Sequence, residues 1–296
     1  MSFELDDHQI KMGSIATIGM FDGVHKGHRF VLNQLVTYAR KRGLQSLAVT
    51  FDHSPRHEQV LTPLDEKLRL IKETGVDRIE VLSFTPELKA LSARDFMHQV
   101  LREQLGVEVL LTGYDNRFGH NRTEGFDDYV RYGRELGIEV VGLPAEGSVS
   151  SSLIRRLLQQ GHVNEAAKEL GRCYTLQGHV VHGERMGTAL GFPTANLVPD
   201  DPCQLVPASG VYAVRCLMSD VRGKTYKGMM NIGTRPTFGR HTQTLEVHVL
   251  DYEGDLYDQQ LCVSFVSRLR EERRFDSLDA LKEQLVKDTI QAKQLL

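Results

Sequence analysis

The chain has 296 residues and a formal net charge of −3, with 36 Lys and Arg residues against 39 Asp and Glu residues. This length suggests two domains of ordinary size. The balanced charge argues against binding nucleic acid or an anionic membrane through bulk electrostatics. No apolar run approaches the ~20 residues that span a bilayer, and the acidic start lacks the apolar core of a secretory signal. We therefore expect a cytoplasmic protein without nucleic-acid or membrane partners.

The first 145 residues alternate between strand-like and helix-like segments. The expected strands are Ser14–Met20, Ser46–Phe51, Arg78–Phe84, Val109–Thr112 and Glu139–Leu143. The expected helices are Arg29–Arg42, Pro63–Thr74 with Leu64, Leu68 and Ile71 inward, a helix capped by Ser92 that carries Phe96, Val100, Leu101 and Leu105, and Phe126–Leu136. This order predicts a Rossmann-like, doubly wound parallel sheet with helices on both faces. Ligands bind such sheets beyond the carboxyl ends of the strands.

The pattern changes in the second half of the chain. Ser150–Leu170 is typical of two short helices broken at Gly161. Short strands separated by turn residues follow at Thr175–Val181, Val211–Leu217, Tyr226–Ile232, Leu245–Leu250 and Leu261–Phe265. They predict a small antiparallel barrel. A C-terminal amphipathic helix should begin at Ser277, with Leu278, Leu281, Leu285 and Ile290 on one side. We place the domain boundary near Gly171–Cys173, which gives domains 1–171 and 172–296.

The four cysteines follow no paired or zinc-ribbon spacing. In a chain of this length they favour reduced, mostly buried thiols over disulfides or a metal site. They are Cys173, Cys203, Cys216 and Cys262.

The segment 18–28, IGMFDGVHKGH, connects the first strand to the first helix. A helix N-terminus offers unpaired N–H groups and a partial positive charge, which suit an anion. His25 and His28 are three residues apart and can face one ligand, where they could stabilise charge at phosphorus. The segment lacks the G-K-[ST] of a Walker P-loop. The plain alternatives are two unrelated surface histidines or half of a zinc site.

The segment GMFDGVHKGH resembles the nucleotidyltransferase motif of the bacterial bifunctional riboflavin kinases/FAD synthetases. Further segments are similar to motifs of that family in the same order. They are GYDNRFG at Gly113–Gly119, VSSSLIR at Val149–Arg155, GFPTAN at Gly191–Asn196, NIGTRPTF at Asn231–Phe238 and LEVH at Leu245–His248. The resemblance extends from about Ile15 to the C-terminal helix.

The resemblance implies two reactions in series, with Mg²⁺ accompanying ATP. A C-terminal kinase would phosphorylate riboflavin to FMN, and an N-terminal adenylyltransferase would join FMN to AMP, giving FAD and pyrophosphate. At the adenylyltransferase site, His25, His28 and Arg155 would be the catalytic residues. Residues that would contact ATP or its phosphates there are Gly19, Phe21, Gly23, Gly27, Asp115, Ser151 and Ser152.

At the kinase site the resemblance makes Glu246 the general base. Gly183, Gly191, Thr194 and Asn196 would contact ATP, with Thr194 and Asn196 as oxygen ligands of Mg²⁺. The flavin would meet Asp52 and Asn116 in the first domain and Arg268 and Phe275 in the second. The loop at Met186–Thr188 is less basic than is usual in the family, so weaker ATP binding by the kinase is expected.

Three other readings stay open from the sequence. One is an FMN adenylyltransferase whose kinase is weakened. Another is a flavin-binding carrier or sensor that has lost turnover. The last is a related H-x-G-H transferase that acts on another phosphorylated acceptor.

Overall fold

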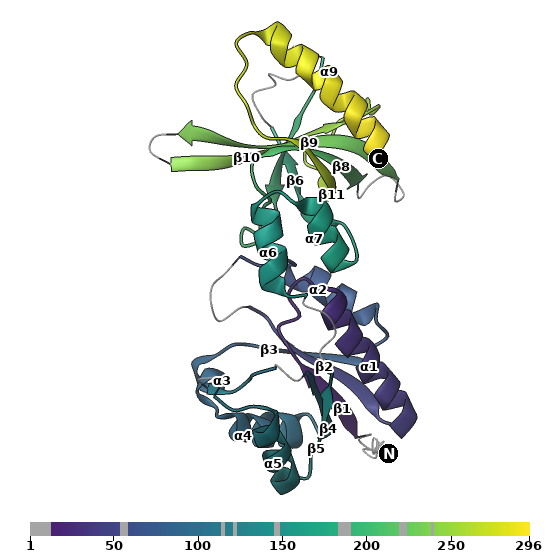
Figure 1. Ribbon diagram of the computed structural model, residues 1–296, viewed down its shortest axis with the longest axis vertical. Coiled ribbons are helices and arrows are strands. Elements are labelled where there is room, and N and C mark those ends of the chain that lie inside the picture. The colour runs from purple at the N-terminus through teal and green to yellow at the C-terminus, as the bar shows by residue number, and fades with distance from the viewer. Residues whose placement is uncertain are drawn as a thin grey trace, which may run out of the picture. The chain divides into compact units, whose positions relative to one another are not determined.

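The computed structural model describes residues 13–53, 59–113, 116–120, 123–144, 149–182, 191–218, 224–237 and 240–296. The contacts divide the chain into two compact units. The first comprises residues 1–58 and 62–149, and the second comprises residues 59–61 and 150–296. Figure 1 shows the order of the elements along the chain.

The first unit is built around a five-stranded parallel sheet in the order β3-β2-β1-β4-β5. The strands are β1 (Ser14–Ile18), β2 (Gln45–Phe51), β3 (Arg78–Leu82), β4 (Val107–Gly113) and β5 (Glu139–Leu143). The parallel sheet was predicted. The direction of winding reverses between β1 and β4, and the carboxyl ends of strands at such a switch point are where open α/β sheets bind ligands.

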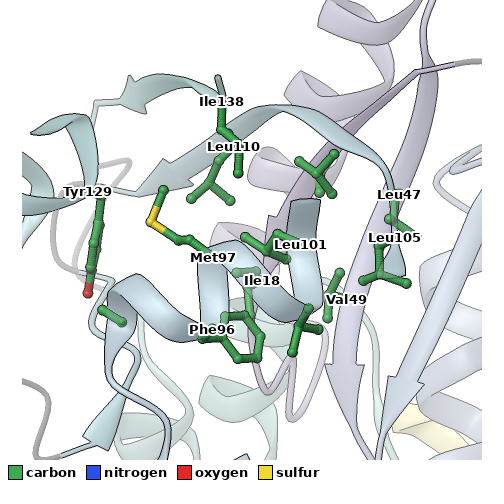
Figure 2. Close-up of a cluster of buried hydrophobic side chains, with 14 of the residues drawn as sticks. Ile18, Leu47, Val49, Phe96, Met97, Leu101, Leu105, Leu110, Tyr129 and Ile138 are labelled. Atoms are coloured by element: carbon green, nitrogen blue, oxygen red, sulfur yellow. The ribbon is translucent and has the colours of Figure 1, made fainter. Parts of the chain in front are cut away.

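Both faces of this sheet are covered, as predicted. Ile15 and Ala48 pack with α1 (Lys26–Arg42) and α2 (Leu64–Lys72). Ala16 and Leu47 are the neighbours of these two residues in the sequence and point to the other face of the sheet. They belong to the apolar cluster of Figure 2, together with residues of η1 (Phe96–Gln104) and α5 (Phe126–Leu136). Successive side chains of a strand point to opposite faces, so burial on both sides explains the continuous apolar runs.

The segment after β3 differs from its prediction. A short helix, α3 (Pro86–Ala90), was not predicted. Ser92 does cap the next helix, since its Oγ accepts a hydrogen bond of 3.1 Å from the N–H of Asp95. After one turn, α4 (Ala93–Asp95), the chain continues as the π-helix η1. The apolar residues of this segment recur every four to five positions, which suits i→i+5 bonding better than an α-helix.

The buried face of α2 is also shifted from the predicted one. Its buried residues are Lys67, Leu70 and Ile71, whereas Leu64 and Leu68 are only partly covered. These three positions follow the i, i+3, i+4 spacing of one helix face. A lysine at the centre of that face was not expected, because lysine is rarely buried without a partner.

The second unit contains a closed barrel in the order β10-β7-β6-β11-β8-β9, with antiparallel pairs throughout. Its strands are β6 (Tyr174–Val181), β7 (Ala195–Pro199), β8 (Gly210–Met218), β9 (Thr225–Thr237), β10 (Arg240–Val249) and β11 (Gln260–Arg270). The barrel was predicted, but β7 was not. This short strand connects β6 to β10, so it is needed to close the barrel and remove the free edges.

The C-terminal helix α9 (Leu278–Leu295) covers the outside of the barrel, where Ala292 packs with Ala213 and Met229. The predicted apolar face was partly wrong, because Leu278 and Ile290 are exposed. The helix docks instead through a small residue and through Asp288, which is 1% exposed and forms an ion pair of 2.9 Å with Arg270. A hydrophobic pattern does not reveal a docking face that depends on a charge.

The compact units do not divide at the predicted boundary. The helices α6 (Ser151–Gln159) and α7 (Val163–Leu170) belong to the barrel's unit. The N–H of Ala208 donates to the carbonyl of Leu158, and both Leu158 and Val163 are fully buried. Packing therefore moves these helices to the second unit, although the chain pattern changes only after them. The functional division at residue 171 stays a prediction.

All four cysteines are free, as expected. The expectation that most are buried was wrong, because only Cys216 is buried, while Cys203 is exposed. Burial raises the pKa of the Cys216 thiol to about 12, so this group stays protonated and unreactive at neutral pH.

The ion pair of α9 gives a test of how this helix is held. Asp288→Ala leaves the Arg270 guanidinium without its carboxylate, which should lower the free energy of unfolding by about 2–4 kcal/mol. Asp279→Ala, at an exposed position of the same helix, is the matched control and should change little. Thermal unfolding and amide hydrogen exchange in α9 measure both effects. Equal results for the two variants would contradict the role of the pair.

Candidate active sites

The turn between β1 and α1 has an unusual backbone. Phe21, Gly23 and Val24 have φ values of 49°, 84° and 37°, in the left-handed region. For residues other than glycine this conformation costs on the order of 1–3 kcal/mol and persists only where packing enforces it. Phe21 and Val24 are 2% and 0% exposed. Packing therefore fixes the turn in one geometry.

His25 and His28 lie together at the end of this turn. Their rings stack with centroids 3.6 Å apart and planes at 18°. His25 is the N-cap of α1, and its Nδ1 accepts a hydrogen bond of 3.3 Å from the N–H of His28. Because Nδ1 accepts, the proton of the neutral His25 ring is on Nε2. The cap thus fixes the ring's tautomer as well as the start of the helix.

Two glycines of this motif make room for aromatic rings. A Cβ at Gly19 would come within 3.1 Å of the Phe21 ring, and a Cβ at Gly27 within 3.3 Å of the His25 ring. The Phe21 ring in turn meets His28 edge-on, with centroids 5.3 Å apart. The glycines therefore allow the close ring packing that positions the histidine pair.

His28 is held in its neutral form. Burial lowers its pKa well below the usual value, and the nearby His25 and Lys67 lower it further. Its Nδ1 is buried and has no hydrogen-bond partner among the described residues. A neutral imidazole at this position can donate or accept a hydrogen bond, and it adds no charge before substrates bind.

Lys67 of α2 also belongs to this site, and the sequence analysis missed it. The side chain is 5% exposed, and its Nζ donates a 2.6 Å hydrogen bond to the carbonyl of Phe51, the last residue of β2. Burial lowers the pKa of Lys67, while Asp22 and Asp52 act to raise it. The one available signal was its place in the i, i+3, i+4 pattern of α2.

Two predicted flavin residues lie near the carboxyl ends of the strands. The amide of Asn116, after β4, donates a 2.9 Å hydrogen bond to the carbonyl of Ile18 at the end of β1. Burial acts to raise the pKa of Asp52, but hydrogen bonds from Ser83 and from backbone N–H groups lower it below the usual value. Both side chains therefore support the sheet edge. The predicted residue Asp115 lies outside the described part of the chain.

The predicted phosphate residues of the VSSSLIR segment open α6. Ser150 is the N-cap, and its side chain accepts a hydrogen bond from the N–H of Leu153. Ser151 and Ser152 are the first two helical residues, as the motif suggested. Arg155 donates from Nε to the carbonyl of Gln59, 3.1 Å away. These residues belong to the second unit, whereas the histidine pair belongs to the first.

A second group of polar residues lies on the outer face of the barrel. Glu246 of β10 pairs in register with Asn196 of β7 on one side and Asn231 of β9 on the other. Leu245 and Val247, on either side of Glu246, are buried. Since side chains alternate along a strand, Glu246 points outward, and its paired asparagines share that face.

His248, two residues after Glu246, positions the GFPTAN segment. Its Nδ1 donates a 2.7 Å hydrogen bond to the carbonyl of Pro193, and its ring meets Phe192 edge-on. Gly191 precedes them with a φ of 84°. This anchor holds Thr194 and the start of β7 beside β10. The sequence analysis names His248 only as the last residue of the LEVH segment.

The donor set of this face suits a magnesium ion that is held mainly by nucleotide phosphates. In the part of the chain that the structure describes, no cluster of three His, Cys, Asp or Glu residues could hold a metal by itself. Thr194 and Asn196 instead offer neutral oxygen atoms. Mg²⁺ is commonly bound by one or two protein ligands together with phosphates and water. Gly183 and the loop at Met186–Thr188 lie outside the described residues.

Arg268 and Phe275 make contacts within the protein. The guanidinium of Arg268 donates to the carbonyl of Ser209 and lies 3.7 Å from Glu271. A Cβ at Gly161 would come within 2.9 Å of the Arg268 Cδ. Phe275 lies under the guanidinium groups of two other arginines, at 4.8 and 5.6 Å from the ring centre. Arg268 therefore has a packing role whatever else it contacts.

Comparisons with known proteins cover both halves of the chain. Residues 7–153 match the family model described as FAD synthetase, and residues 170–296 match the one described as riboflavin kinase. A protein of Escherichia coli K12 named bifunctional riboflavin kinase/FMN adenylyltransferase is 39% identical over 95% of this chain and 92% of its own length. The chain belongs to this bifunctional family. A protein with the same name from Pseudomonas fluorescens is 38% identical over 96% of this chain and 93% of its own length.

A solved structure has the same fold over nearly the whole chain. It is a Streptococcus pneumoniae protein titled macrolide-efflux protein, with a TM-score of 0.87 and 30% identity over 95% of this chain and 94% of that one. In the described ranges of the present chain, no helix has the length and apolar character to cross a membrane.

The lowered pKa of His28 makes stability depend on pH. A histidine in an unfolded chain titrates near pH 6.5, whereas His28 in the folded chain has a pKa well below this value and binds a proton less readily. Below about pH 6.5 the unfolded state therefore binds more protons, and stability should fall by up to about 1.4 kcal/mol per pH unit from this residue. Urea unfolding at pH 7.5 and 5.5 should show a smaller difference for His28→Gln than for the unmodified chain. His98→Gln, at an exposed position, is the control, and equal pH dependence of the two variants would contradict this account.

Proposed function

We propose that this chain phosphorylates riboflavin with ATP to give FMN and then adenylylates FMN with ATP to give FAD and pyrophosphate. The observation that carries the proposal is the match to bifunctional relatives over almost the whole length, with a separate family model for each half. The stacked His25 and His28 and the outward Glu246 supply each half with suitable chemistry.

In the adenylyl transfer, a phosphate oxygen of FMN attacks the α-phosphorus of ATP, and the bond from that phosphorus to the leaving pyrophosphate breaks. No covalent intermediate or proton transfer is required, so positioning and charge stabilisation provide the catalysis. His25, His28 and the N-terminus of α1 would stabilise charge on the α-phosphate. Ser151, Ser152 and Arg155 would bind the polyphosphate, Arg155 through its two-pronged guanidinium.

The other predicted contacts of this site complete the proposal. We place the turn residues against ATP, with Asp115 toward its ribose or adenine, and Asp52 and Asn116 toward the flavin. The turn residues are Gly19, Phe21, Gly23 and Gly27. What supports this placement is the position of the turn residues, Asp52 and Asn116 at the carboxyl edge of the parallel sheet, beside the switch point.

In the kinase reaction, the 5′-hydroxyl oxygen of riboflavin attacks the γ-phosphorus of ATP, its proton passes to the Glu246 carboxylate, and ADP leaves. A carboxylate on a strand beside the nucleotide suits this general-base role. Thr194 and Asn196 would hold the Mg²⁺ that accompanies ATP and neutralises phosphate charge. Gly183 and Gly191 would lie along ATP, and Arg268 and Phe275 would close over the flavin.

The first test is a time course with purified protein, riboflavin, ATP and Mg²⁺, resolved by chromatography. FMN should appear first and FAD should follow, because the product of the kinase is the substrate of the transferase. FMN without FAD would leave only the kinase. If neither riboflavin nor added FMN is converted, the chain is not this enzyme, and a flavin that co-purifies without turnover would favour a carrier.

Two variants test whether the sites are separate. His28→Ala should lower FAD formation from FMN by at least about 100-fold while FMN formation from riboflavin continues. Glu246→Ala should lower FMN formation from riboflavin by a similar factor, because a general base is lost, while FAD formation from added FMN continues. Both products are measured on each protein, after circular dichroism has confirmed folding. Loss of both activities in either folded variant would contradict the assignment of separate sites.

A further inference from the structure

Three buried polar groups around the turn 21–25 have hydrogen-bonding capacity that no described residue fills. Lys67 donates to Phe51, and this is the one hydrogen bond of its ammonium in the described part of the chain, although an ammonium has three N–H groups. The hydroxyl of Thr62, which is 4% exposed, has no partner among the described residues, and the same holds for Nδ1 of His28. Leaving a buried polar group without a partner is unfavourable, so three together indicate a site that a polar ligand completes.

The three groups belong to one site. Asp22, in the turn itself, accepts a 3.2 Å hydrogen bond from the N–H of Thr62. The charge of Lys67 interacts with Asp22 and Asp52 and also with His28. Its bond to the last residue of β2 places the ammonium at the carboxyl edge of the sheet, where ligands of parallel sheets bind.

We propose that the Lys67 ammonium binds a phosphoryl oxygen of the nucleotides that react beside the histidine pair. This inference rests on the proposed adenylyl transfer. That reaction brings the anionic phosphate of FMN against the anionic α-phosphate of ATP, and their repulsion is large in a partly buried site. A cation that is already fixed by Phe51 reduces this repulsion without reorganisation during the reaction.

The competing explanation is a purely structural lysine, which holds the Phe51 carbonyl and balances Asp22 and Asp52. Three substitutions separate the two. Lys67→Arg keeps the charge, Lys67→Gln keeps an N–H donor without charge, and Lys67→Met keeps neither. Lys72→Met is the matched control, because Lys72 is exposed on the same helix.

The assay starts from FMN and ATP, so that the kinase is bypassed. Lys67→Met and Lys67→Gln should each lower kcat/KM for FAD formation by about 10- to 100-fold, and Lys67→Arg should recover part of the loss. Riboflavin phosphorylation by the same proteins and both reactions of Lys72→Met should stay at the level of the unmodified chain. A rise confined to the KM for FMN assigns the contact to the FMN phosphate, and one confined to the KM for ATP assigns it to ATP. A loss in kcat alone assigns it to the transition state.

A folded Lys67→Gln variant that forms FAD at the unmodified rate would overturn the inference, because it would show that charge is not needed. The inference would also be overturned if the loss of FAD formation in each variant were fully accounted for by its unfolded fraction, as measured by thermal unfolding. If the unmodified chain makes no FAD from FMN, the proposed function itself fails, and this inference fails with it. The unmodified protein therefore distinguishes the two failures.

Discussion

The central strand of the parallel sheet imposes the constraint on which the first site depends. All five residues of β1 are buried, and parallel neighbours pair with it on both sides. Its side chains cannot rearrange without opening both apolar clusters, so the strand ends at a fixed point. The chain must then enter α1 through a tight turn. The left-handed Phe21 and Val24 are a consequence of that geometry, and packing offsets their conformational cost.

The position of the histidine pair follows from this turn. His25 caps the helix that begins there, and the cap bond to the backbone of His28 brings the two rings into a stack. Burial, together with the nearby His25 and Lys67, then lowers the pKa of His28, so His28 is neutral when substrates arrive. Positive charge comes instead from the helix N-terminus and from Lys67, both fixed by the fold. Such fixed charges are worth more than mobile ones, because no reorganisation is needed when charge develops.

The barrel uses a different constraint for the second site. Strand alternation places Leu245 and Val247 in the interior, so Glu246 must face outward. Closure of the barrel through β7 brings Asn196 beside it, and His248 fixes the segment before β7 through Pro193. On another part of the outer face, α9 packs on Ala213 and Met229, and its ion pair with Arg270 joins the helix to the last residue of β11. The polar face and the docked helix thus depend on the same closed sheet.

The sequence by itself determined the two fold types and the histidine motif. The strand and helix periodicities are local, and the motif residues are adjacent along the chain, so the sequence alone indicates His25, His28 and the opening of α6. Tertiary structure alone decided the rest. Lys67 enters the site because α2 packs with this side chain on its buried face. The strand β7 forms because it hydrogen-bonds to both β6 and β10 and so closes the barrel. The helix α9 docks through Asp288 because this carboxylate pairs with Arg270 of β11. In each case the deciding contact is with residues distant in sequence, which no local pattern contains.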